Sequence, residues 1–310
     1  MHMYNDFLKD DINRLNKTGL VYLYCSNKVL LEILENSELW LTDSSFMNDT
    51  KELILFDMVF SSIIDYMKNN HEISDDEYSI IHNLYEWFIA GHHSFFSCFS
   101  FNRDSLALWD RYGDHAQGVA IGFNLSKLNI RKGPTAYEFP IFHEDEQLGV
   151  LPVHYFDKNN DENKIYEMIK SAIVLARREI ENDKNEFNGL RPEDYYRSKL
   201  LPLCALRDIT KSNHFHDENE IRIIFNEWEN SALFKRKVRK TNSNLFGCYY
   251  RGLDNSIQRY YKLKIDAEDC VEQIILGAKN NTRIKDLDFL LKNMGLHTGV
   301  YKSIISYEPR

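Results

Sequence analysis

The stretch 94–124, with the sequence SFFSCFSFNRDSLALWDRYGDHAQGVAIGFN, constrains the fold more than any other part of the chain. Residues 94–100 are rich in aromatic side chains and 119–123 are apolar, which predicts two buried strands. Between them, the spacing of Trp109 and Tyr112 places both on one face of a short helix. Such a strand–helix–strand unit presents a few side chains at one edge of a sheet. The alternative is a packing unit with Trp109 in the core.

The rest of the chain alternates between helical and strand patterns, which predicts an α+β fold in a single domain, 1–310, with a helical insertion at 157–210. The predicted strands cover residues 20–25, 39–41, 150–155, 218–225, 249–250, 260–265, 271–276 and 300–305. The predicted helices cover residues 4–17, 26–35, 49–66, 75–89, most of 160–210, and 282–294.

The net charge of −9 argues against a protein that coats nucleic acid by bulk charge. A local basic loop could still bind a nucleic acid or protein acceptor. Its residues are Lys235, Arg236, Lys237, Arg239 and Lys240. The five cysteines form no CxxC pair, no apolar run reaches the ~18 residues that span a bilayer, and the first residues lack a secretion signal. We therefore expect a cytoplasmic protein with reduced thiols and no membrane partner.

The strongest candidate for chemistry is the acidic row within 218–225. Alternate residues of a strand share a face, so Glu218, Glu220 and Arg222 are predicted to point the same way. Two carboxylates beside a cation can stabilise the cationic, sugar-like transition state of glycosidic bond cleavage. We assign these three residues as candidate catalytic residues. The alternative is a solvated outer face whose ion pair contributes little.

Polar residues at strand ends are the candidates for binding a cofactor or ligand. Tyr24 and Ser26 end the first predicted strand, and Ser97 and Ser100 lie in the third. Hydroxyls in such positions either hold polar groups of a ligand or cap the next helix. We add the polar loop residues Asn48, Asp49 and Glu52, and the aromatic pair Trp109 and Tyr112. For Asp49 and Glu52 the alternative is a capping box at the start of the next helix.

Known catalytic motifs are absent from the sequence: it contains no GxGxxG, P-loop, HExxH or GxSxG. A zinc site from His214, His216 and Glu218 is conceivable because alternate residues of a strand can share a metal, but no third histidine completes it. We predict no metal. A nuclease that uses Asp49, Glu52, Glu218 and Glu220 around a divalent ion is kept as a further alternative.

Four segments together resemble the bacterial domain-of-unknown-function family twenty-nine seventy-one, which is often met in abortive-infection and phage-defence loci. These segments are LVYLYCSNKVLLEILENSELWLTDSSFMNDTKE, SCFSFNRDSLALWDRYGDHAQGVAIGF, KSNHFHDENEIRII and VEQIILGAKN. They stand in the family's order between about residues 20 and 305, and the helical insertion is the least matched part.

The layout of that family is similar to the ADP-ribosyltransferase fold, which implies a mixed or antiparallel sheet core with flanking helices. In that fold a strand-end residue anchors NAD, a middle strand shapes the pocket, and a late strand supplies a catalytic glutamate. By this resemblance Tyr24 or Ser26 takes the first role, Ser97 to Ser100 the second, and Glu220 or Glu218 the third. DNA-modifying relatives have histidine-x-threonine where this chain has Leu23-Tyr24-Cys25, so the usual histidine anchor is missing.

The resemblance implies an ADP-ribosyltransferase or NAD glycohydrolase, with NAD as its substrate, that acts as a toxin or effector in anti-phage defence. A second hypothesis is a non-enzymatic module that senses a nucleotide or binds a phage protein or an antitoxin. The acceptor, the oligomeric state and the trigger do not follow from the sequence.

Overall fold

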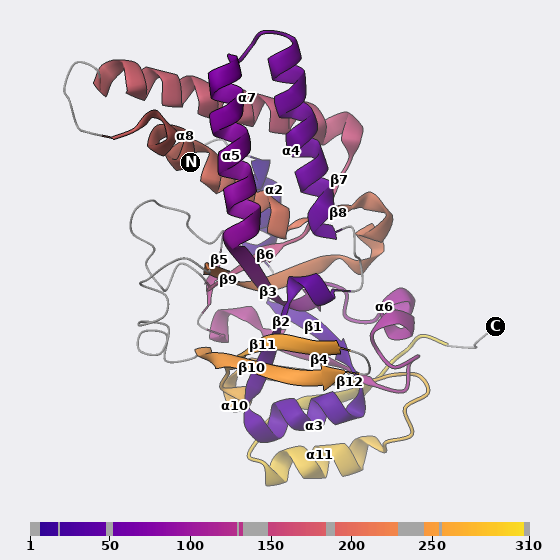
Figure 1. Ribbon diagram of the computed structural model, residues 1–310. Helices are drawn as coiled ribbons and strands as arrows, with labels where there is room; N and C mark the ends of the chain where they lie inside the picture. The colour runs from indigo at the N-terminus through magenta and orange to yellow at the C-terminus, as the bar shows by residue number, and fades with distance from the viewer. Residues whose placement is uncertain are drawn as a thin grey trace.

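The computed structural model describes residues 7–17, 19–47, 52–128, 130–132, 148–183, 190–228, 245–253 and 256–306. In this part of the chain an 11-stranded, mostly antiparallel sheet is flanked by helices (Figure 1), so the predicted α+β class is confirmed. Along the main path the strands follow the order β10-β11-β2-β3-β1-β4-β12-β13, while β9 pairs with β3 and β6, and β6 pairs with β5. The pairs β12–β13 and β5–β6 are parallel.

The strands of the sheet are β1 (Leu20–Cys25), β2 (Glu38–Asp43), β3 (His92–Ser100), β4 (Val119–Asn124), β5 (Arg131–Lys132), β6 (Leu148–Pro152), β9 (Glu220–Trp228), β10 (Leu245–Leu253), β11 (Ser256–Lys264), β12 (Val271–Leu276) and β13 (Gly299–Lys302). A separate parallel pair consists of β7 (His154–Phe156) and β8 (Thr210–Ser212). The helices are α2 (Lys9–Lys17), α3 (Asn27–Asn36), α4 (Glu52–Asn69), α5 (Asp75–Gly91), α6 (Leu106–Arg111), α7 (Lys158–Asp183), α8 (Pro192–Cys204), α10 (Ala267–Cys270) and α11 (Ile284–Asn293). The 3-10 turns are η1 (Ser44–Phe46), η2 (Leu125–Lys127), η4 (Ala205–Asp208) and η5 (Asn213–Glu218).

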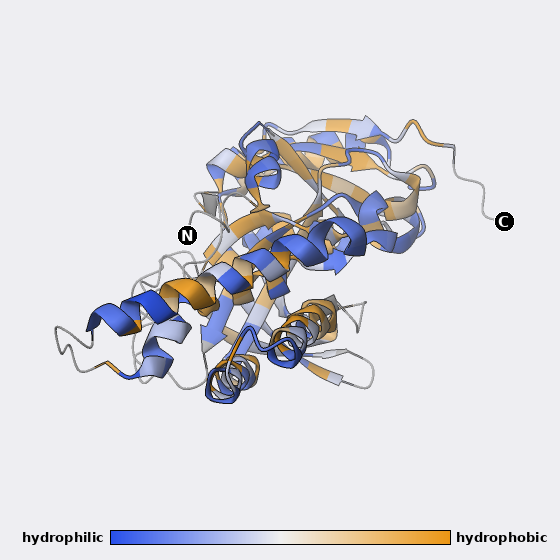
Figure 2. Ribbon diagram, turned by 90° about the horizontal axis from the view of Figure 1, so that it is seen from above, coloured by the Kyte–Doolittle hydropathy of each residue, from blue (hydrophilic) through white to orange (hydrophobic). Residues whose placement is uncertain are grey.

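The two faces of the sheet carry different hydrophobic clusters. On β3, Phe95 and Phe99 point into a first cluster that is shared with α3, α10 and α11. Phe96, between them, points into a second cluster that is built by α4, α5, α7 and α8. Figure 1 shows the two sets of helices at opposite ends of the molecule, and Figure 2 shows hydrophobic colour on many of the strands and on parts of the helices. The alternation along one strand thus holds two helical layers together.

A third, smaller cluster lies beside the second cluster, over β1 and β4. It contains Trp109 from α6 together with Tyr22 and Tyr24 from β1. The loop after α6 must come very close to its neighbours, because a Cβ added to Gly118 would lie 2.1 Å from the Cys25 carbonyl oxygen. Packing of this loop against β1 therefore requires a glycine at position 118.

Most predicted elements are present, but two strand predictions are wrong. Residues 150–155 do not form one strand: β6 ends at Pro152, and β7 belongs to the other sheet. The strand predicted from residue 218 begins at Glu220, because Glu218 ends a 3-10 turn and Asn219 has a left-handed backbone (φ 49°). The helical stretch expected over 160–210 is divided into α7, α8 and η4, and ends before β8.

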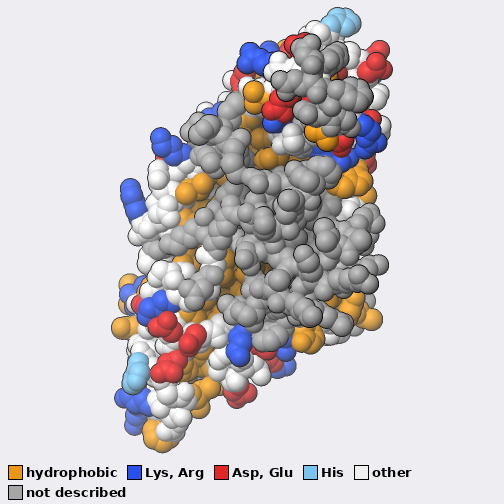
Figure 3. All heavy atoms as spheres, turned by 90° about the vertical axis from the view of Figure 1, so that its left-hand side faces the viewer, with side chains coloured by type: hydrophobic (Ala, Val, Ile, Leu, Met, Phe, Trp, Pro, Cys, Tyr) orange, Lys and Arg blue, Asp and Glu red, His pale blue; other side chains and the backbone are white. Residues whose placement is uncertain are grey.

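No helix among the described residues has both the length and the apolar character to cross a membrane. All five cysteines are free. On the face that Figure 3 shows, the described charged side chains are of mixed sign. The basic loop 235–240 lies outside the described residues.

Candidate functional site

A pocket of about 770 Å³ opens on the sheet face between the second and third hydrophobic clusters. Side chains from β1, β2, β3, β10 and β11 line it, together with α6 and the turn η5 that precedes β9. Its volume lies within the range that is typical of small-molecule sites. Many of the lining residues are aromatic: Tyr22, Tyr24, Trp40, Phe46, Phe96, Phe99, Tyr112 and Phe215.

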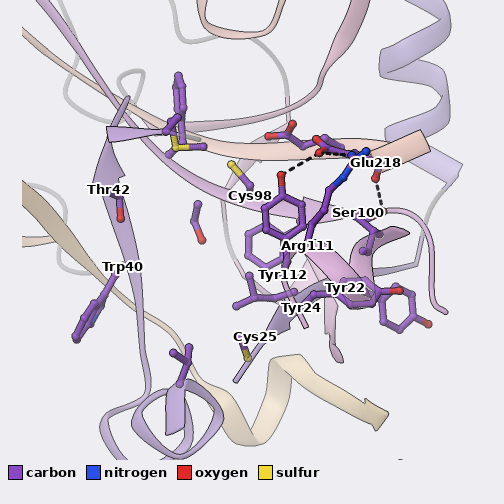
Figure 4. A pocket seen from close by; sticks show the side chains of 18 of the residues that line it. Tyr22, Tyr24, Cys25, Trp40, Thr42, Cys98, Ser100, Arg111, Tyr112 and Glu218 are labelled. Atoms are coloured by element: carbon purple, nitrogen blue, oxygen red, sulfur yellow. Dashed lines mark hydrogen bonds and ion pairs between the residues drawn. The ribbon is translucent and has the colours of Figure 1, made fainter. Parts of the chain in front are cut away.

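A network of ion pairs forms one wall of this pocket (Figure 4). Lys211 of β8 bridges the two carboxylates, with its Nζ 2.6 Å from Glu218 Oε2 and 2.8 Å from Glu220 Oε2. Arg222 Nε donates to Glu220 Oε1 over 2.7 Å, and Arg111 Nη1 donates to Glu218 Oε1 over 2.9 Å. Glu218 points toward Arg111 and Tyr112 in the close view. Two carboxylates thus meet three cations, which leaves the network as a whole, including Arg222 behind the wall, with one excess positive charge.

The carboxylate of Glu220 is an anion at any physiological pH. Burial by itself raises its pKa, but Arg222 and Lys211 outweigh burial and lower the pKa to about 2. Glu220 is therefore a poor proton acceptor and acts on a ligand through its negative charge and its remaining lone pairs.

Neighbouring hydroxyls fix the position of these carboxylates. Tyr112 donates its hydroxyl to Glu218 Oε1 over 2.9 Å, and Ser100 donates its hydroxyl to the Glu218 carbonyl oxygen over 2.6 Å. Tyr155 of β7 accepts the backbone N–H of Glu220 over 2.7 Å. Contacts from three separate elements therefore set where η5 ends and β9 begins.

Another part of the pocket is formed by β2, β10 and β11. Trp40 and Thr42 lie on the side of the pocket away from Glu218 (Figure 4). Arg251 Nη2 donates to Thr42 Oγ1 over 3.2 Å and to Gln258 Oε1 over 3.1 Å. The guanidinium lies 5.4 Å from the centre of the Trp40 ring. This part of the pocket therefore combines the aromatic surface of Trp40 with the positive charge of Arg251.

The structure brings six of the predicted site residues together around the pocket. They are Tyr24, Ser97, Ser100, Tyr112, Glu218 and Glu220. The hydroxyls of Tyr24 and Ser100 are engaged within the protein: Tyr24 donates to the Asn102 carbonyl oxygen and accepts the Ser105 N–H, each over 3.0 Å. These two residues hold the chain that enters α6, because Ser100 also accepts the backbone N–H of Asn102.

Three predicted site residues lie elsewhere. Trp109 is 1% exposed and donates its indole N–H to Asp104, so the expectation that it walls the pocket is wrong and the packing alternative holds. Ser26 caps α3 by accepting the Val29 N–H. Arg222 is fully buried behind Glu220 against the Phe96 ring and does not line the pocket. Asn48 and Asp49 lie outside the described residues, and Glu52 begins α4 without a described side chain.

The cations of the pocket could not be recognised from the sequence. Lys211 and Arg111 stand in segments that were already singled out, yet nothing in their spacing indicates that they pair with Glu218. Arg251 lies in a strand recognised only by Tyr249 and Tyr250. Side chains alternate along a strand, which places Arg251 on the same face as Tyr249. This alternation is the one sequence signal that could have indicated Arg251 as a site residue.

Metal ligands do not gather in the described residues: no three His, Cys, Asp or Glu side chains there could share an ion. His214 and His216 are exposed on η5, whereas Glu218 is buried against Lys211. The strand geometry on which the imagined zinc site depended is absent, because these three residues belong to a 3-10 turn.

The fold and this site define an α+β protein with a charged, aromatic-lined pocket on a mostly antiparallel sheet. The family model described as a protein of unknown function, DUF2971, matches residues 108–223 of the chain. The match runs from α6 into β9 and includes Arg111, Lys211, Glu218, Glu220 and Arg222, the whole network of ion pairs. No curated protein and no solved structure matches the chain.

Proposed function

We propose that the pocket binds NAD and that the protein cleaves the bond between nicotinamide and ribose, as an ADP-ribosyltransferase or an NAD glycohydrolase. The observation that carries this proposal is the position of Glu218 and Glu220. Both carboxylates line one aromatic pocket together with Tyr24, Ser97 and Ser100 of two other strands. Stretches far apart in the chain meet there, as the proposed reaction requires.

The reaction follows from the charges on the wall. The bond between C1′ of the ribose and the nicotinamide nitrogen breaks, and its electron pair stays with nicotinamide, which leaves as a neutral molecule. Positive charge then develops on the ribose, where the anionic Glu220 stabilises it. An acceptor hydroxyl, or water, forms the new bond to C1′ and releases its proton. With a pKa of about 2, Glu220 stabilises charge but does not take up that proton.

Hydrogen-bonding capacity at the carboxylates permits this role. Each oxygen of Glu220 accepts one hydrogen bond from a described residue, Oε1 from Arg222 and Oε2 from Lys211. A carboxylate oxygen accepts about two. A ribose hydroxyl could therefore bind without displacing either cation. The acceptor would be a nucleic acid or a protein, and by the family resemblance the setting would be anti-phage defence, with the protein acting as a toxin or effector.

A second function, a non-enzymatic nucleotide sensor, is favoured by one observation. The pocket carboxylates are already neutralised by cations at 2.6–2.9 Å. Neutralised carboxylates can still bind a ligand through hydrogen bonds. They lack the uncompensated negative charge that would accelerate glycosidic cleavage. A sensor would bind a nucleotide saturably and form no product.

The test is release of free nicotinamide from NAD, measured by chromatography with and without magnesium. The wild-type protein should release nicotinamide in the presence of EDTA, and Glu220→Gln should lower the rate by at least about 100-fold, because one charge-stabilising group at a reacting centre is typically worth 10²–10³ in rate.

The matched control is Glu162→Gln, which removes a charge from an exposed pair with Lys158 on α7. It should release nicotinamide at the wild-type rate. Circular dichroism checks that Glu220→Gln is folded, since it leaves Lys211 and Arg222 with one carboxylate fewer. A folded Glu220→Gln protein with an unchanged rate would rule out the proposed reaction, and saturable binding of NAD without product would favour the sensor.

A further inference from the structure

Arg251 differs from the other cations of the pocket in what it pairs with. Arg111 and Lys211 are each bound to a carboxylate, at 2.9 Å and 2.6 Å. Arg251 donates to Thr42 Oγ1 and Gln258 Oε1, which are both neutral acceptors. Within the described ranges, no carboxylate forms an ion pair with Arg251.

The surroundings of Arg251 favour an anionic partner. Its side chain is half-buried on the pocket lining, and burial lowers its pKa. A guanidinium carries five N–H donors in a rigid fork that suits phosphate oxygens. Hydrogen bonds to Thr42 and Gln258 fix the fork through Nε and Nη2, and none of the described residues accepts a hydrogen bond from Nη1, whose donors can reach a ligand.

An aromatic surface lies directly beside this cation. Trp40 packs against Tyr260 with ring centres 4.8 Å apart, and Arg251 lies 5.6 Å from the Tyr260 ring. Of the two rings, Trp40 lines the pocket and Tyr260 is buried behind it. A half-exposed indole next to an arginine can contact a nucleobase while the arginine binds the phosphate attached to it.

We propose that Arg251 and Trp40 form a phosphate-and-base subsite, so that the natural ligand is a dinucleotide whose phosphate-bearing adenosine half binds at β2 and β10 while its other half reaches Glu218 and Glu220. This inference rests on the proposed function for the identity of both halves, adenosine included. The subsite itself recognises a phosphorylated nucleoside whether or not any bond is cleaved. It extends the site beyond residues 108–223, the part of the chain that the family model matches.

Isothermal titration with ADP-ribose, AMP and adenosine tests the subsite without turnover. Arg251→Gln should weaken binding of ADP-ribose and AMP by at least about tenfold, since a hydrogen bond to a charged group contributes about 1.5–3 kcal/mol and 1.4 kcal/mol is a factor of ten. Binding of adenosine, which has no phosphate, should change less than twofold. Trp40→Leu should weaken all three ligands.

The charge-matched control is Arg283→Gln at the exposed start of α11, which should bind all three ligands like the wild type. Equal losses for AMP and adenosine in Arg251→Gln, or no loss in either, would overturn the subsite. So would a wild-type protein that binds neither ADP-ribose nor AMP.

The two proposals fail in different ways. Arg251-dependent binding of AMP with no nicotinamide released from NAD would leave the subsite standing and refute the cleavage reaction. Release of nicotinamide with the same KM for NAD in Arg251→Gln and the wild type would leave the reaction standing and refute the subsite.

Discussion

Lys211 is the residue on which the charge balance of the pocket depends. It is 4% exposed and bridges Glu218 and Glu220. Glu218 keeps Arg111 without it, and Glu220 keeps Arg222. A buried ion that loses its partner destabilises the folded state strongly. Loss of Lys211 should therefore cost more free energy of unfolding than the attraction between Lys211 and the two carboxylates contributes.

Removing that bridge should destabilise the protein strongly. Lys211→Met keeps the length of the side chain but leaves two buried carboxylates with one shared cation fewer, and we expect a loss of about 3–5 kcal/mol in the free energy of unfolding. Urea denaturation measures it. The same substitution at Lys292, whose pair with Asp288 is exposed on α11, should cost about 0.5 kcal/mol or less. Equal effects at both positions would contradict the buried bridge.

The residue scale also shows what the sequence could and could not predict about the site. Glu218 and Glu220 were recognisable because they are close in the chain and lie at the edge of an apolar run. Their partners come from β8 and α6, and no local pattern indicates a contact between elements. Trp109 was misassigned for the same reason: helical spacing gives a face, but only the fold decides whether that face meets a pocket or the core.

At the scale of elements, α2 is attached to the helical layer by a histidine between two carboxylates. His154 of β7 lies 3.4 Å from Asp11 of α2 and 3.0 Å from Asp161 of α7. The Phe7 ring lies 4.6 Å from its imidazole ring. Burial by itself lowers the pKa of His154, but the hydrogen bonds to Asp11 and Asp161 raise it to about 9. A charged imidazole thus joins three elements.

This attachment should make stability depend on pH. The pKa of His154 is higher in the folded state than the unfolded value of about 6.5, so its stabilising contribution is complete below pH ~6.5 and is lost as pH rises toward 9. The expected loss over that window is on the order of 3 kcal/mol. In His154→Gln the decline should be smaller by that amount, and what remains near pH 9 comes from the buried thiols of Cys25, Cys204 and Cys270, whose pKa burial raises. Urea midpoints at pH 6 and pH 9 give the comparison, and an equal slope in both proteins would exclude His154 as its source.

The sequence predicted the helices and strands better than it predicted the site. Apolar runs and helical periodicity predicted most strands and helices. The strand was predicted to begin two residues too early because the left-handed backbone of Asn219 does not change the alternation of side-chain types between Glu218 and Glu220. The long strands β10 and β11 were underestimated because Arg251, Gln258 and Arg259 interrupt their apolar character.

For the whole molecule, the central question is whether the two helical layers fold together. The sequence predicts one domain with an insertion, but α7 and α8 pack against α4 and α5 in one continuous cluster. That cluster and the first share β3 and β9 as a common wall, because the two faces of each strand belong to different clusters. Two layers on one sheet should therefore unfold in a single step.

Adjacent residues of β9 offer a matched test of this cooperativity. Ile223 is 0% exposed in the first cluster, and Ile224 is 2% exposed in the second, on the opposite face. Each truncation to alanine should cost about 2–5 kcal/mol. If the layers form one cooperative unit, both variants lower the same urea midpoint, and circular dichroism and tryptophan fluorescence remain coincident. If the helical layer were a separate unit, Ile224→Ala would shift a helical transition while Ile223→Ala left it in place. Two separated transitions would replace the single domain with two, and would make the pocket between the clusters an interface between them.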